Sequence, residues 1–174
     1  DIRTHFRGYF TSALASLSKS DFIFDGKRIH FDKLLFSARN LKSILISNVH
    51  GDSICQYADS DGDAVFTQCK GNLIGNSLSS TGNIIFIGFE SETSGNITSV
   101  CERIYFINCF NKNILGAGVS GKTDIEAFFI NSESNIMGTD NRESAGLTRY
   151  FVECKLGYPI LSDGAESKMH FIDC

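Results

Sequence analysis

The chain of 174 residues contains no tryptophan, one proline and two methionines. No apolar run approaches the about 20 residues of a membrane-spanning helix, so we expect no membrane insertion. The formal net charge is -4, and this argues against a nucleic-acid partner, because proteins that bind nucleic acids usually carry a basic surface. Hydrophobic residues make up 42% of the chain, which excludes a disordered protein. The length fits one domain.

Recognisable metal and cofactor motifs are also missing. The six cysteines form no Cys-x-x-Cys pair, and the four histidines are scattered without a metal-binding spacing. No glycine-rich phosphate loop occurs. The acidic run Asp59–Asp63 resembles the start of a calcium loop but lacks the later ligands of such a loop. We therefore expect neither a metal ion nor a cofactor.

What the sequence does contain is an internal repeat, the phrase Phe-x-x-Cys. It occurs as Phe66–Cys69, Phe106–Cys109, Phe151–Cys154 and Phe171–Cys174, and in altered form as Ile46–Val49, Phe86–Phe89 and Phe129–Ser132. The copies follow one another at intervals of 20 to 23 residues. A period this constant predicts stacked structural units.

Each unit has the pattern of a strand, a bend, a second short strand and a loop. Alternation places the Phe, and the small or apolar residue two positions before it, on one face of the strand. A polar residue or glycine precedes the Cys position and marks a bend. Because one coil cannot bury its own apolar face, the pattern predicts an all-β fold, a parallel β-helix of about 20–23 residues per coil. The alternative is a leucine-rich repeat, whose spacing also fits Leu41–Val49.

The first forty residues do not repeat. The segment Ile2–Leu17 has mixed helical spacing, and Phe22–Phe24 and Arg28–Phe31 flank an Asp-Gly turn that favours a β-hairpin. We expect residues 1–40 to form a cap of a helix and a hairpin, because solenoid ends need covering. Residues 41–174 would then form the coils, as a segment of a longer solenoid.

Two columns of side chains carry expectations about chemistry. The Cys position is taken elsewhere by Val, Phe and Ser, so it indicates an inward stack of reduced thiols and not a metal or redox site. The strand residues that face outward are apolar from Ile85 onward. A strand that is apolar on both faces is covered on both. The cover is an identical chain around a threefold axis, a sugar ring on an aromatic platform, or another part of the same chain.

The repeated phrases FINC, FVEC and FIDC, with the segments KNIL, SNIM and FIFDGKRIHF, resemble the right-handed parallel β-helix of bacteriophage tailspikes and capsule-degrading enzymes. Pectate lyases, other polysaccharide lyases and mannuronan epimerases share the pattern. The resemblance implies a homotrimer in a virion tail, assembled in the host cytoplasm. Such a homotrimer binds, and often degrades, a surface polysaccharide of the host bacterium. Abundant cysteine fits assembly in a reducing cytoplasm.

The candidate catalytic residues depend on the reaction. For a glycoside hydrolase we expect carboxylates among Glu102, Asp124 and Glu126, because neighbouring rungs bring such groups about 5–10 Å apart. Arg149 would hold substrate charge. For a lyase, Tyr150 or His170 beside Arg149 would be the base. Two other interpretations stay open. The charged groups can be solvated salt bridges, and the chain can be a non-catalytic structural or receptor-binding solenoid or a leucine-rich-repeat-like interaction protein.

Overall fold

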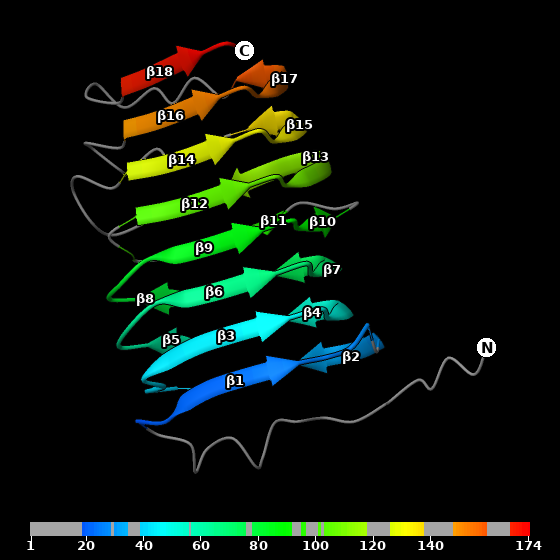
Figure 1. The fold of residues 1–174 in the computed structure, drawn as a ribbon, viewed down its shortest axis with the longest axis vertical. Coiled ribbons are helices and arrows are strands. Elements are labelled where there is room, and N and C mark those ends of the chain that lie inside the picture. Colours follow the sequence, from blue (N-terminus) through cyan, green and yellow to red (C-terminus); the bar gives the residue numbers. More distant parts are fainter. Residues whose placement is uncertain are drawn as a thin grey trace.

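The computed structural model describes residues 19–28, 30–34, 39–55, 57–75, 78–91, 95–96, 101, 103–117, 126–137, 148–159 and 168–174. All regular structure in these ranges is β-strand, and the strands stack in parallel as a β-solenoid (Figure 1). The predicted all-β parallel β-helix is thereby confirmed, and the leucine-rich repeat is not observed in this part of the chain. The described residues contain no helix long and apolar enough to cross a membrane.

Two long sheets run along the solenoid, each with one strand per rung (Figure 1). The first sheet consists, in spatial order, of β1 (Asp21–Asp25), β3 (Ser43–Ser47), β6 (Ala64–Thr67), β9 (Ile84–Ile87), β12 (Arg103–Ile107), β14 (Glu126–Ile130), β16 (Thr148–Val152) and β18 (Lys168–Ile172). The second consists of β2 (His30–Leu34), β4 (His50–Ile54), β7 (Lys70–Ile74), β10 (Glu90–Ser91), β13 (Phe110–Ala117), β15 (Glu133–Met137) and β17 (Lys155–Pro159), with β11 (Gly95–Asn96) beside β13. A short third sheet pairs β5 (Asp59–Ser60) with β8 (Ser79–Ser80).

A ladder of phenylalanine rings fills the core behind the first sheet. Consecutive rings stack at centroid distances of 4.9, 5.1, 5.0, 5.0 and 4.9 Å, and they belong to Phe66, Phe86, Phe106, Phe129, Phe151 and Phe171. The distances match the about 4.8 Å spacing of neighbouring strands, so the parallel register sets them. This confirms the predicted Phe column. Ile44, Ile84 and Ile104 form a second buried column beside it.

A single residue turns the chain from the first sheet into the second on the rungs that begin with β3 to β16, and Asp173 has the same backbone after β18. The first rung differs, with positive φ at both Lys27 and Arg28. The backbone of the single bend residue is left-handed, with φ between 45° and 63°, at Asn48, Gln68, Gly88, Asn108, Asn131, Glu153 and Asp173. These are the polar or glycine positions expected to mark the bend. Glycine, asparagine and aspartate adopt this conformation most readily. The bend shifts the alternation of inward and outward side chains by one residue. The next residue, at the Cys position, therefore faces the core.

The cysteine column is a hydrogen-bonded internal stack. The Sγ of Cys109 lies 3.5 Å from the carbonyl oxygen of Phe86 on the preceding rung and 3.4 Å from that of Ile107 on its own. Cys154 makes the same two contacts with Phe129 and Val152, at 3.2 and 3.4 Å. All six cysteines are free. Burial raises the pKa of Cys69 to about 11 and that of Cys109 to about 12, so these thiols are neutral at physiological pH.

The structure differs from the expected hairpin near the N-terminus. Strands β1 and β2 do not pair with each other, because β1 pairs in parallel with β3 and β2 pairs in parallel with β4. The turn after Asp25 is the bend of the first coil, stabilised where Asp25 accepts hydrogen bonds from the Lys27 amide and the Asn48 side chain, both at 3.1 Å. The predicted helix Ile2–Leu17 lies outside the described residues.

Candidate functional site

The outer face of the first sheet carries a second aromatic ladder. Tyr105, Phe128, Tyr150 and His170 stack at centroid distances of 4.9, 4.7 and 4.9 Å, with interplanar angles of 8°, 7° and 12°. Each inner ring has both faces covered by its neighbours, so the ladder presents ring edges outward. A sugar packs on a ring face, and this arrangement therefore leaves little platform for stacking. The ladder suits packing against another apolar surface better.

The predicted hydrolase residues do not form a carboxylate pair among the described residues. Glu126 lies on the outer face of β14, where its Oε2 accepts a hydrogen bond at 2.7 Å from the Nε of Arg103 on the preceding rung. Both side chains are partly exposed, so the ion pair is worth less than about 1 kcal/mol. Glu102 and Asp124 lie outside the described residues.

The predicted lyase residues separate onto opposite faces of β16. Tyr150 points outward into the aromatic ladder and is stacked on His170. Arg149 points inward and is 1% exposed, in register with Ala127 on one side and Met169 on the other. The structure thus brings Tyr150 and His170 together and places the Arg149 guanidinium inside the solenoid.

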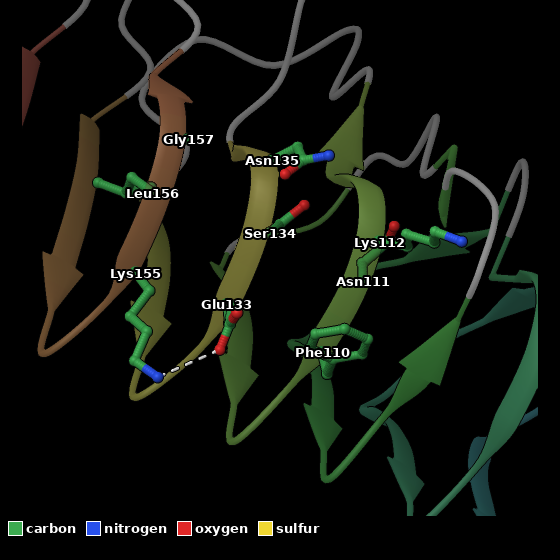
Figure 2. A pocket seen from close by; sticks show the side chains of 9 residues that line it. All are labelled: Phe110, Asn111, Lys112, Glu133, Ser134, Asn135, Lys155, Leu156 and Gly157. Atoms are coloured by element: carbon green, nitrogen blue, oxygen red, sulfur yellow. Dashed lines mark hydrogen bonds and ion pairs between the residues drawn. The ribbon is translucent and has the colours of Figure 1, made fainter.

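A groove of about 290 Å³ lies on the outer face of the second sheet, near its C-terminal end (Figure 2). We call it the upper groove, and it is lined by Phe110, Asn111, Lys112, Glu133, Ser134, Asn135, Lys155, Leu156 and Gly157. These residues come from β13, β15 and β17, so the groove spans three rungs (Figure 2). Its exposed side chains are an aromatic ring, one amide, two lysines and a carboxylate, whereas Asn111 and Ser134 are buried beneath them.

The upper groove is lined by three consecutive residues from each of its three strands. Phe110, Glu133 and Lys155 share one register position, and Lys155 contacts the Glu133 carboxylate at 3.4 Å (Figure 2). Phe110 is 44% exposed, stacks on no described aromatic side chain, and lies in register between Glu90 and Glu133. A Cβ at Gly157 would lie 2.6 Å from the carbonyl oxygen of Asn135, so this position stays without a side chain and the groove stays open.

A second groove, of about 390 Å³, lies further down the same side of the solenoid. We call it the lower groove, and it is lined by Arg28, Asn48, His50, Gln68, Cys69, Lys70, Gly88 and Glu90. His50, Lys70 and Glu90 occupy the register position that Phe110 occupies on the next rung. The two grooves therefore follow one another along a single column of side chains.

Neither groove was found from the sequence. Its column consists of the residue that follows the Cys position, and this residue varies from His50 through Lys70 and Glu90 to Phe110. The side chains at this position do not repeat from unit to unit. Comparing the residue that follows the Cys position in each repeat would nevertheless have revealed a run of polar and aromatic groups. No cluster of three metal-binding side chains occurs in the part of the chain that the structure describes. No family model, curated protein or solved structure matches the chain.

Proposed function

We propose that this solenoid binds a polysaccharide along the outer face of its second sheet. The observation that carries the proposal is the upper groove, where the exposed Phe110 shares the lining with Lys112, Glu133, Asn135 and Lys155 (Figure 2). A sugar ring needs an apolar surface under its C–H groups and several hydrogen-bond partners around its hydroxyls. Few polar groups placed around an apolar surface are also the usual composition of a ligand site.

The shape of this face suits an extended polymer. Successive rungs repeat at about 4.8 Å, comparable to the advance of an extended polysaccharide per sugar residue. The upper groove alone spans three rungs, and the lower groove continues in the same direction. A polymer lying along the solenoid axis would therefore meet a new set of side chains with each sugar.

The test is titration calorimetry of the complete chain against a panel of bacterial surface polysaccharides, with Phe110→Ala as the diagnostic variant. We expect at least one polymer to bind, and Phe110→Ala to weaken it about tenfold, which is about 1.4 kcal/mol. Tyr57→Asn is the matched control, because Tyr57 is 49% exposed, lies outside both grooves and has a φ of 55° that asparagine accepts. An equal loss in both variants, or no binding by any polymer, contradicts the proposal.

Degradation of the bound polymer is a further part of the proposal, and it follows from the resemblance to capsule-degrading tailspikes. New reducing ends would indicate a hydrolase, with Glu102, Asp124 and Glu126 as the residues to replace. Unsaturated uronates would indicate a lyase, with Tyr150 and His170 as the candidate bases. The upper groove contains one described carboxylate, Glu133, so the geometry supports binding more directly than hydrolysis. A polymer that binds without any new product leaves a non-catalytic binding solenoid.

A further inference from the structure

The lower groove differs from the upper one in its charge. Arg28, His50 and Lys70 contribute up to three positive charges, and His30 lies on the rung before His50 at the same register position. Glu90 is the one carboxylate that lines the groove, and it pairs with Lys70 at 2.8 Å. Arg28 forms no ion pair with a described carboxylate. The groove is therefore cationic on a chain whose formal net charge is -4.

The groove opens where the bend column is interrupted. Asn108 and Asn131 on later rungs are linked by an amide hydrogen bond of 2.8 Å, but Gly88 has no side chain to continue the column. The Gln68 amide occupies the space beside Gly88, since a Cβ there would clash with the Gln68 Nε2. The side-chain amides of Asn48 and Gln68 are thus placed next to the cationic side chains, and the Asn48 amide also donates a hydrogen bond of 3.1 Å to Asp25.

We propose that the lower groove binds an anionic substituent of the polysaccharide, a carboxylate, a sulfate or a phosphate. Arg28 can hold two oxygens of such a group with its planar guanidinium, and Lys70 adds a second charge. The inference rests on the proposed function and specifies its substrate class. The polymer would place sugar rings against Phe110 in the upper groove and a negative group in the lower groove.

Histidine makes the affinity of this groove depend on pH. Burial lowers the pKa of His50, and the neighbouring Lys70, Arg28 and His30 lower it further, while Glu90 acts in the opposite direction. A bound anion favours the protonated imidazole, so binding takes up a proton. Affinity should therefore rise as the pH falls. His30 is the other titratable imidazole that faces the groove column.

The experiment compares three polymers with the complete chain: neutral dextran, polygalacturonate and sulfated dextran. We expect the anionic polymers to bind at least about tenfold more tightly than dextran. The double variant Arg28→Gln/Lys70→Gln should remove this difference. The double variant Arg39→Gln/Lys42→Gln is the matched control, because it removes the same charge at exposed positions outside both grooves.

The outcomes separate this inference from the proposed function. Equal affinities for dextran and the anionic polymers, or equal losses in both double variants, would overturn the anion site and leave polysaccharide binding standing. Absence of binding to all three polymers and to the bacterial panel would overturn both.

A pH series tests the role of histidine. Sulfated dextran keeps its charge between about pH 7.5 and about pH 5.5, so its affinity should increase as the pH falls over that range. His50→Gln should abolish most of that increase, whereas a loss confined to His30→Gln would assign the proton to His30 and contradict the role of His50.

Discussion

The backbone N–H of Cys109 donates a hydrogen bond of 3.1 Å to the Oγ of Ser132 on the following rung. Cys154 and Cys174 repeat this contact, with a distance of 3.4 Å from the Cys154 nitrogen to the Cys174 Sγ. The side chain at this position also lies close to backbone carbonyl oxygens of its own and the preceding rung. Cysteine and serine are thus interchangeable here because both are small and both can accept and donate.

Ser132→Ala should therefore be more harmful than Ser132→Cys. Alanine leaves the buried Cys109 N–H without its acceptor, so we expect a loss of about 1–3 kcal/mol in the free energy of unfolding. Cysteine keeps the contact, and its unfolding midpoint in urea should stay near that of the unchanged chain. Equal stability of the two variants would show that the side-chain hydrogen bond contributes nothing.

The Phe ladder should dominate the stability of the solenoid. Phe106 lies between Phe86 and Phe129 in the core, and Phe106→Ala should cost about 3–5 kcal/mol, measured by urea unfolding. Phe110→Ala removes the same atoms from a partly exposed site and should change stability by less than about 0.5 kcal/mol. The pair thus serves as a control for the binding experiment, in which Phe110→Ala must remain folded. Similar losses for both would contradict the assignment of Phe106 to the core.

Replacing Glu153 with glycine should stabilise the folded chain, because the φ of 52° at this position is unfavourable for most side chains. Left-handed backbone costs an ordinary residue about 1–2 kcal/mol, so Glu153→Gly should raise the free energy of unfolding by up to about 1 kcal/mol after the entropic penalty of glycine. Glu153→Val should lower it. In the extended strand β15, Glu133→Gly should be destabilising by about 0.5–1 kcal/mol, and a gain there would contradict this explanation.

Thiol reactivity should distinguish Cys174 from the buried cysteines. Cys174 is exposed, whereas burial raises the pKa of Cys69, Cys109 and Cys154. Alkylation of the folded chain at about pH 8, followed by mass spectrometry, should modify Cys174 first. The folded state also keeps thiol protons that the unfolded state releases above about pH 9, so stability should fall as the pH rises beyond that value. Uniform labelling of all six thiols before unfolding would contradict the buried stack.

The outer face of the first sheet is where the expected homotrimer would form. Ile87, Ile107 and Ile130 form a half-buried aliphatic column beside the aromatic ladder. Light scattering should give three times the 19.1 kDa of one chain, and Ile130→Lys should dissociate the assembly. Thr67→Lys is the matched control, because Thr67 lies in the same column where the apolar run ends. A monodisperse monomer for the unchanged chain contradicts the trimer.

The interior of the solenoid could be predicted from the sequence because each inward side chain must fit the one below it. That requirement repeats at every rung, and it is visible as the Phe-x-x-Cys phrase. Arg149 is the polar exception in the apolar column two positions before the Phe; alternation places that column on the inward face, and Arg149 is buried there. The hairpin expected around Asp25 was wrong, because an Asp-Gly turn looks the same whether the flanking strands pair or diverge into different sheets.

The grooves could not be predicted for a different physical reason. The outward side chains of this column do not stack like with like, so His50, Lys70 and Phe110 differ in chemistry while sharing one register position. Their proximity follows only from the register of the second sheet. Charge alone was also uninformative, since a net charge of -4 hides the cationic groove at Arg28 and His50.

The single-residue bend has a consequence for how the chain tolerates added length. Rungs separated by 20 residues and by 23 residues stack in the same register, as the contacts of Lys70 with Glu90 and of Cys109 with Ser132 show. The bend between the two sheets is the same on both kinds of rung. One extra residue falls within β13, where the register shifts next to Ala117, and the others fall between Ala117 and Glu126. The interval between Ala117 and Glu126 is therefore where we expect a foreign peptide to be inserted without shifting the register of either long sheet.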